Sequence, residues 1–124
     1  MNHRVLIADD EPNIVISLEF LMKREGHVVS IARDGVAALE AIRRERPDLV
    51  LLDVMMPGMT GFEVCQAVRA DATLAGTKIV LLTAKGRDID VAKGMALGAS
   101  DYLTKPFSTR ELATRVRALL ESAA

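Results

Sequence analysis

Four short segments of the chain are apolar without alternation, and longer stretches of mixed polarity separate them: Val5–Ala8, Val28–Ile31, Leu49–Leu52 and Ile79–Leu82. A weaker fifth segment is Tyr102-Leu103. Apolar runs that do not alternate are typical of strands covered on both faces of a parallel sheet. We therefore expect five buried strands, which begin near positions 5, 28, 49, 79 and 101.

The stretches between these strands have helical spacing and recognisable end signals. Pro12 suits the first position of a helix that Gly26 can end, and Asp34 can cap the next helix. The capping-box spacing opens the third and fifth helices, in the pairs Thr60 with Glu63 and Ser108 with Glu111. The pattern thus predicts a helix after every strand.

The fourth helical segment, roughly residues 87–97, carries the weakest signal. Gly86, Gly94 and Gly98 frame or interrupt it, and an interior glycine costs about 1 kcal/mol relative to alanine. We expect this helix to be the least stable of the five and a candidate moving part.

Repeated strand–helix units of this kind predict an α/β fold, a doubly wound parallel sheet with helices on both faces. The chain has 124 residues, which fits one domain over residues 1–124. No internal repeat, low-complexity tract or linker interrupts it.

The overall charge argues against two classes of partner. Sixteen basic and seventeen acidic residues give a formal net charge of −1, whereas a dedicated binder of nucleic acid or of an anionic membrane carries a basic excess. No apolar run approaches the roughly 20 residues of a membrane span, and Asp9 interrupts the first apolar run before a signal peptide can form. We expect a soluble, cytoplasmic protein.

Polar side chains follow four of the five predicted strands. The first strand is followed by the acidic cluster Asp9-Asp10-Glu11. The third strand ends in Asp53, the fourth ends in Thr83, and Lys105 follows the fifth. The acidic cluster alone would serve equally well to cap a helix that starts with proline. Because ligands of doubly wound sheets bind at the carboxyl ends of the strands, we expect all these groups to form one site.

The chemistry of this set indicates phosphoryl transfer. Clustered carboxylates repel one another unless a cation joins them, and oxygen ligands without cysteine or histidine favour Mg²⁺ over zinc or copper. The hydroxyl of Thr83 and the ammonium of Lys105 suit a tetrahedral oxyanion. An aspartate such as Asp53 can act as the nucleophile and form an acyl phosphate.

These residues lie in segments that resemble the response-regulator receiver domains of bacterial two-component signalling. The matching segments are LIADDE at 6–11, LVLLDVMMPGMTG at 49–61, IVLLTA at 79–84 and GASDYLTKPF at 98–107, and the resemblance covers nearly the whole chain. It implies a flavodoxin-like fold with five helices and a five-stranded sheet in the order 2-1-3-4-5.

The resemblance also implies a role for each residue of the site. Asp53 would be the phosphoacceptor, Asp10 a direct Mg²⁺ ligand, Asp9 a ligand largely through a bound water, and Met55 a ligand through its backbone carbonyl. Mn²⁺ is a possible substitute for Mg²⁺.

Three further residues are expected to take part in the conformational response to phosphorylation. Thr83 and Lys105 would hold phosphoryl oxygens, with the Lys105–Pro106 bond cis. Tyr102 would turn inward when Thr83 moves toward the phosphoryl group.

The implied partners are a sensor histidine kinase or phosphotransfer protein upstream and a protein effector, unknown from the residues, downstream. The switched surface would comprise the fourth helix, the fifth strand and the fifth helix. The protein would be a phosphoacceptor switch and no enzyme, with at most slow self-dephosphorylation, because neither Met55 nor Lys85 can orient an attacking water as a carboxylate or amide would.

The same surface resembles that of DNA-binding regulators of the winged-helix subfamily, which dimerise through charged pairs on it. Asp101, Glu111 and Arg115 match the subfamily, whereas three positions lack the usual charge: Val91, Ala96 and Ser100. We expect a monomer or weak dimer before phosphorylation. We also expect a single-domain regulator with no direct contact to nucleic acid.

Three other functions are weighed against this one. A flavodoxin-like electron carrier needs a loop rich in serine, threonine and glycine where Asp9-Asp10-Glu11 stands. A phosphohydrolase of the haloacid-dehalogenase type resembles the set but places a second aspartate where Met55 stands. A pseudo-receiver that binds partners without phosphorylation is disfavoured by the intact set of charged residues.

Overall fold

The computed structural model describes residues 3–84 and 86–122, which form a single parallel sheet between two layers of helices. The sheet order is β2-β1-β3-β4-β5, as the resemblance to receiver domains implied. Its strands are β1 (Arg4–Ala8), β2 (Val28–Ala32), β3 (Leu49–Asp53), β4 (Lys78–Ala84) and β5 (Asp101–Lys105).

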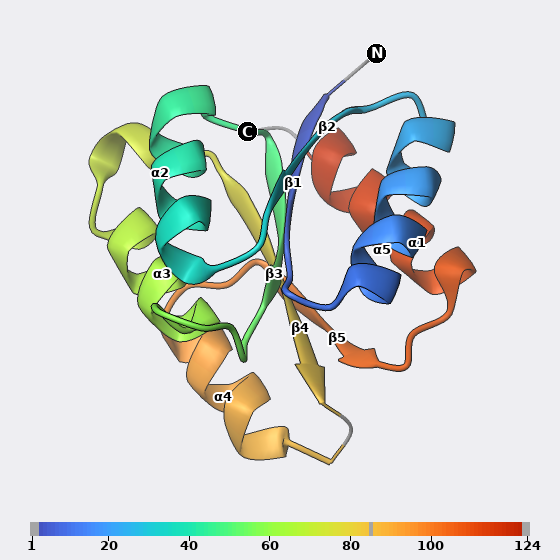
Figure 1. Ribbon diagram of the computed structural model, residues 1–124. Coiled ribbons are helices and arrows are strands. Elements are labelled where there is room, and N and C mark those ends of the chain that lie inside the picture. The colour runs from blue at the N-terminus through green and yellow to red at the C-terminus, as the bar shows by residue number, and fades with distance from the viewer. Residues whose placement is uncertain (1–2, 85, 123–124) are drawn as a thin grey trace.

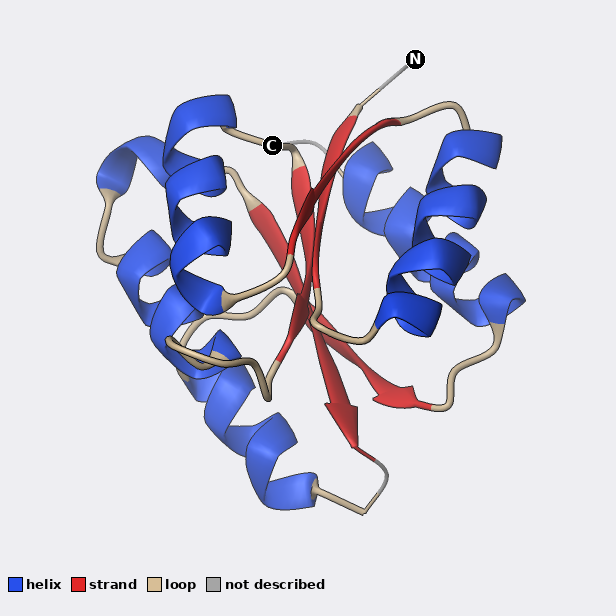
Figure 2. Cartoon of the chain, viewed as in Figure 1, coloured by secondary structure: helices blue, strands red, loops and turns tan. Residues whose placement is uncertain are grey.

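Helices α1 and α5 cover one face of the sheet, and α2, α3 and α4 cover the other (Figures 1 and 2). The bounds are α1 (Pro12–Arg24), α2 (Gly35–Glu45), α3 (Gly61–Arg69), α4 (Asp88–Ala96) and α5 (Thr109–Glu121). A short 3₁₀ helix, η1 (Ala72–Leu74), also precedes β4 and was not anticipated. Within the described residues no helix has the length and apolar character needed to cross a membrane.

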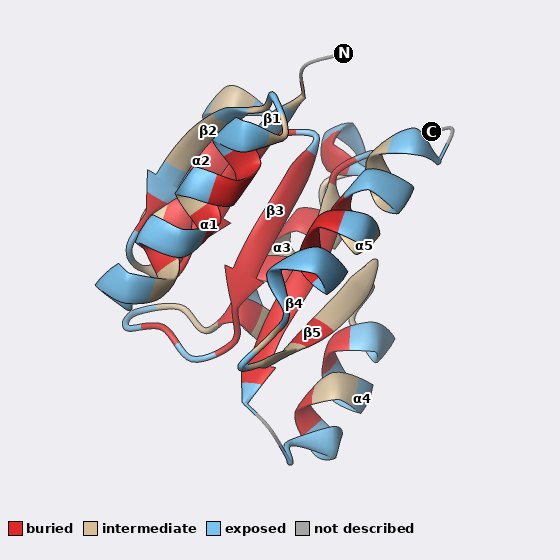
Figure 3. Ribbon diagram, turned by 90° about the vertical axis from the view of Figure 1, so that its right-hand side faces the viewer, coloured by how far each residue is buried: buried red, intermediate tan, exposed pale blue. Residues whose placement is uncertain are grey.

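The apolar side chains of the strands contribute to two hydrophobic cores, one on each side of the sheet. Along β1, Val5 and Ile7 pack against α1 and α5, while Leu6 and Ala8 pack against the opposite helical layer. Since successive side chains of a strand point to opposite faces, a strand with helices on both sides must be apolar at every position. Figure 3 shows β3 and β4 buried along most of their length.

Strand β2 departs from this rule. We expected it to be buried on both faces, but it lies at the edge of the sheet and Val28 remains 52% exposed. An edge strand has a neighbour on one side only, so its side chains are less completely covered. Apolar composition alone could not separate this strand from the central ones.

The predicted helix ends are confirmed at four helices. Helix α1 starts at Pro12, and the Asp34 carboxylate accepts the Ala37 N–H at the start of α2. Thr60 and Glu63 form the complete capping box of α3, whereas at α5 the Ser108 hydroxyl accepts the Glu111 N–H. These local hydrogen bonds satisfy N–H groups that the helix itself cannot.

The interior glycine of α4 has a packing role. A Cβ at Gly94 would lie 2.0 Å from Cδ1 of Leu81, a buried residue of β4. Glycine therefore allows α4 to approach the sheet closely, at the expense of helix propensity. Arg87, the N-cap residue of α4, also forms no side-chain capping hydrogen bond.

Candidate functional site

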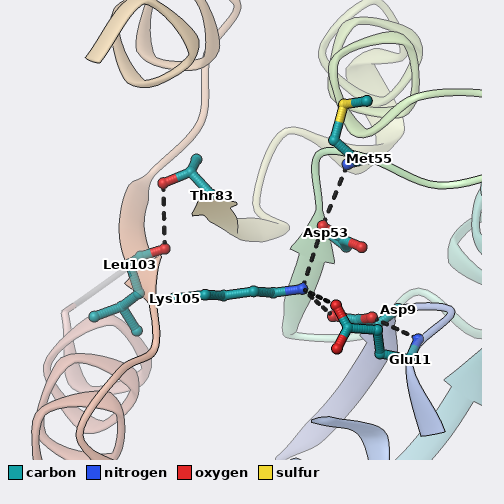
Figure 4. Close-up of polar contacts among 7 residues, drawn as sticks. All are labelled: Asp9, Glu11, Asp53, Met55, Thr83, Leu103 and Lys105. Carbon is teal, nitrogen blue, oxygen red and sulfur yellow. Dashed lines mark hydrogen bonds and ion pairs between the residues drawn. The ribbon is translucent and has the colours of Figure 1, made fainter. Parts of the chain in front are cut away.

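The predicted acidic residues converge at the carboxyl edge of the sheet. Asp9 and Asp10 follow β1, and Asp53 is the last residue of β3. One carboxylate oxygen from each of the three lies within 4.8 Å of the others. Asp9 and Asp53 are buried and Asp10 is exposed (Figure 4 shows Asp9 and Asp53).

The register of the sheet explains this convergence. Asp53 pairs with Leu82, so β3 ends one residue before Thr83 of β4, and Ala84 in turn pairs with Lys105 of β5. Parallel strands in this register all end at the same edge, and β1 is the neighbour of β3 on its other side. Residues far apart in sequence thereby become neighbours.

The Lys105 ammonium lies among three carboxylates (Figure 4). Its Nζ is 3.0 Å from Asp9 Oδ2, 3.5 Å from Asp53 Oδ1 and 3.7 Å from Glu11 Oε1. Although burial opposes the charged form, the hydrogen bond to Asp9 and the surrounding negative charges raise the pKa of Lys105. This lysine partly neutralises the acidic cluster.

Asp53 ionises less readily than an ordinary aspartate. Burial, reinforced by the negative charge of Asp9, raises the pKa of Asp53 to about 6. The Lys105 ammonium and the backbone N–H of Met55, which donates to Asp53 Oδ1 at 3.2 Å, act in the opposite direction. The carboxylate oxygens are suitable ligands for a hard divalent cation, which would relieve their mutual repulsion.

Met55 lies beside the cluster, but its side chain does not point into a packed environment. It is 70% exposed, and it lines the same hollow as Asp10 and Asp53. Its thioether offers a hard cation no oxygen ligand, so a role in metal binding would fall to the backbone carbonyl.

Thr83 and Tyr102 are not turned toward Asp53. The buried Thr83 hydroxyl donates to the carbonyl of Leu103 at 3.5 Å, on the β5 side (Figure 4). Tyr102 is half-buried and lines a different hollow, together with Glu111 and Arg115. The predicted cis bond between Lys105 and Pro106 is confirmed.

The acidic hollow has a volume of about 490 Å³ and contains two residues that sequence reasoning missed. Arg87 and Asp90, at the start of α4, line it together with Asp53 and Lys105. The sequence did contain a signal for this pair. An arginine and an aspartate three residues apart lie on one helix face, and here they follow a strand end, where the site is expected.

The charged residues of β5 and α5 pair within the chain. Arg115 is 2.9 Å from Asp101 Oδ1 and 3.5 Å from Glu111 Oε2, and it also donates to the Tyr102 carbonyl at 3.0 Å.

Comparison with known proteins agrees with the geometry. The family model of the response regulator receiver domain matches residues 5–117. The DNA-binding response regulator MtrA of Mycolicibacterium smegmatis is 48% identical over 120 residues, which cover 97% of this chain and 51% of MtrA. MtrA of Mycobacterium tuberculosis H37Rv is 47% identical over 97% of this chain and 51% of its own length. The chain thus spans about half the length of the curated relatives it matches.

Solved structures of similar proteins cover nearly the whole chain. CheY4, a chemotaxis response regulator of Vibrio cholerae, is 33% identical with a TM-score of 0.89, over 96% of this chain and 99% of that one. The receiver domain of the Francisella response regulator 1452 is 32% identical with a TM-score of 0.89, over 97% and 98%. The receiver domain of the Pseudomonas aeruginosa sensor histidine kinase PA1611, which has magnesium in its active-site cleft, is 27% identical with a TM-score of 0.90, over 98% and 100%.

Proposed function

This chain belongs to the family of response regulator receiver domains of two-component systems, and on that premise we propose that Asp53 accepts a phosphoryl group from a phosphohistidine. The donor would be a sensor histidine kinase or a phosphotransfer protein. The observation that carries the proposal is the position of Asp53, whose carboxylate lies within 4.8 Å of those of Asp9 and Asp10 and 3.5 Å from the Lys105 ammonium.

In the proposed transfer, one carboxylate oxygen of Asp53 attacks phosphorus. The O–P bond of the acyl phosphate forms as the N–P bond of the donor breaks, and the donor imidazole, protonated on its other nitrogen, leaves as the neutral ring. Lys105 neutralises charge on the phosphoryl oxygens, for which an ammonium in a partly buried site is well suited. The Met55 N–H holds the Asp53 carboxylate in place through its hydrogen bond.

Mg²⁺ fits the donor set of this site. Asp9, Asp10 and Asp53 would hold it, with the Met55 carbonyl as a further ligand, and Mn²⁺ could substitute. When bound, the metal neutralises charge on the carboxylates and on the phosphoryl oxygens. The raised pKa of Asp53 supports this, because burial and the negative charge of Asp9 outweigh the positive charge that Lys105 supplies.

The response would start at Thr83. Its hydroxyl now bonds the Leu103 carbonyl, and a phosphoryl group on Asp53 offers it a stronger, charged acceptor. Movement of Thr83 toward Asp53 would open space for Tyr102 and change the surface formed by α4, β5 and α5. A downstream protein would bind that surface in one of its two states.

We assign the protein the role of a phosphoacceptor switch and not of a turnover enzyme, with slow self-dephosphorylation. Met55 supplies no carboxylate or amide to orient a water, and Lys85 lies outside the described residues. The proposed location is the cytoplasm, where kinases of this type act. The relatives named DNA-binding are about twice as long as the matched region, so that name assigns no nucleic-acid contact to this part.

Intact mass spectrometry after incubation with acetyl phosphate and Mg²⁺ tests the proposal. One added phosphoryl group is expected on the wild type and on the control Glu40→Gln, an exposed acid of α2. Asp53→Asn, or omission of the metal, should abolish the adduct. A wild type that takes up neither phosphate nor beryllofluoride would instead be a pseudo-receiver that acts by binding alone.

A further inference from the structure

The charges around the acidic hollow are unbalanced even before phosphorylation. Among the described residues that line it, four are acidic and two are basic: Asp10, Glu11, Asp53 and Asp90 against Arg87 and Lys105. Lys105 is already shared among Asp9, Asp53 and Glu11. Arg87 is therefore the other described cation available to new negative charge in this hollow.

Arg87 is held in the present state by Asp90. Its Nε lies 2.9 Å from Asp90 Oδ2 and its Nη2 lies 3.3 Å from Oδ1. Asp90 is only 8% exposed, whereas the Arg87 side chain is 60% exposed. The pair joins Arg87, the N-cap residue of α4, to the first turn of the helix, where the N-cap side chain bonds no backbone N–H.

A phosphoryl group on Asp53 would compete with Asp90 for this arginine. It adds a charge of about −1.5 to −2 and three acceptor oxygens, and the planar guanidinium matches such oxygens well. The exposed arginine is free to turn on its long stem, while the buried aspartate is not. We propose that Arg87 is a phosphoryl-binding residue, which leaves Asp90 and binds the phosphoryl oxygens when Asp53 is phosphorylated, a role that rests on the proposed function.

The exchange carries a consequence for α4. Once Arg87 leaves, the Asp90 carboxylate is buried without its counter-charge, which is strongly unfavourable. Asp90 then moves toward water, and the first turn of α4 moves with it because the Asp90 N–H bonds the Arg87 carbonyl. Arg87 thus links the chemistry at Asp53 to the start of α4, independently of Thr83.

The affinity for beryllofluoride in the presence of Mg²⁺, measured by calorimetric titration, tests this competition. Arg87→Gln should weaken binding by about three- to tenfold, because a charged contact to the phosphoryl mimic is lost. Asp90→Asn should tighten binding by about two- to fivefold, because it removes the competitor. In the double variant the effect of Asp90→Asn should disappear. Arg43→Gln, an exposed arginine of α2, is the matched control.

Opposite signs distinguish this role from a structural one. If Arg87 and Asp90 only stabilised the helix start, both variants would shift affinity in the same direction, and that result would overturn the inference. Equal affinities for wild type and both variants would overturn it as well. Arg87→Lys, which keeps the charge but not the planar fork, should fall between wild type and Arg87→Gln.

Hydrogen exchange over residues 88–96 provides a second readout. Beryllofluoride should speed exchange at the start of α4 in the wild type and much less in Arg87→Gln; an equal change in both would contradict the proposal. A wild type that binds no beryllofluoride would instead contradict the proposed function, so the two failures are distinguishable.

Discussion

At the scale of single residues, Asp53 occupies a position that is unfavourable for the folded protein at neutral pH. Its raised pKa, about 6, means that burial and the neighbouring Asp9 disfavour the carboxylate. The folded state therefore holds a proton on Asp53 at pH values where the unfolded chain has released it. The resulting stabilisation is fully present only below the ordinary pKa of 3.8, declines as the pH rises above that value, and is lost as the pH passes about 6.

Asp53→Asn should accordingly stabilise the metal-free protein at neutral pH. We expect a gain of about 1–2 kcal/mol in the free energy of unfolding at pH 7.5, a value reduced to account for solvent screening in the open hollow. Near pH 4 we expect almost no gain. Urea unfolding in a chelator at several pH values measures the difference. A gain independent of pH would show that the Asp53 charge is not its cause.

Met55 carries a prediction about the lifetime of the acyl phosphate. Its exposed side chain lines the hollow and offers no polar atom to an attacking water. The phosphorylated wild type should therefore lose phosphate slowly. Met55→Asn, which supplies an amide, should speed the loss by roughly three- to tenfold.

The decay is followed by intact mass after removal of the phosphodonor. Met59→Asn, a change of the same type in the same loop but at a residue that does not line the hollow, serves as the control. Rapid spontaneous loss from the wild type would disprove the prediction.

At the scale of elements, the site depends on how closely α3 approaches the end of β3. Gly61, the first residue of α3, donates its N–H to the Val54 carbonyl at 2.9 Å. A Cβ there would lie 2.4 Å from the Asp53 carbonyl oxygen and 2.9 Å from Val54 Cα. Both are backbone atoms, so no side-chain rotation can relieve the overlap.

Gly61→Ala should therefore destabilise the fold by roughly 2–3 kcal/mol, although alanine favours helices. Gly76→Ala is the matched control, because a Cβ at that position meets nothing within 4 Å; its effect should stay within about 0.5 kcal/mol. Denaturant unfolding compares the two. Equal stability of both variants would mean that the start of α3 shifts freely.

At the scale of the whole molecule, we expect the charges of the α4–β5–α5 surface to limit self-association. Arg115 is already bonded to Asp101, Glu111 and the Tyr102 carbonyl of its own chain. Val91, Ala96 and Ser100 offer no further charges for pairing between two copies. A symmetric dimer through this surface would have few new ion pairs to form.

We thus expect the unphosphorylated chain to be a monomer or weak dimer at micromolar concentration. Light scattering with sedimentation velocity over a concentration series measures this. A tight dimer that survives dilution would contradict the prediction. Loss of such a dimer in Arg115→Ala would locate it on this surface.

Much of this architecture was predictable from the sequence, because the signals were local. The apolar runs placed the strands, and Pro12, Asp34 and Thr60 marked helix starts that the structure confirms. The same runs also predicted which polar groups follow the strands. The sequence identified Gly94 as a residue of low helix propensity, but its close approach to Leu81 depends on packing that no local pattern encodes.

The sequence by itself determined the fold class, the positions of the helices and strands, and the set of groups at the carboxyl edge. The signals for these features are apolar runs and helix caps, which extend over a few residues, and the order of the elements along the chain. Only the tertiary structure decided that Val28 of β2 stays exposed, that Thr83 bonds Leu103, and that Arg87 and Asp90 reach the hollow. Each of these depends on distances between elements and on competition between side chains for partners. Such distances are set when the helices pack on the sheet, and they have no counterpart in the order of residues along the chain.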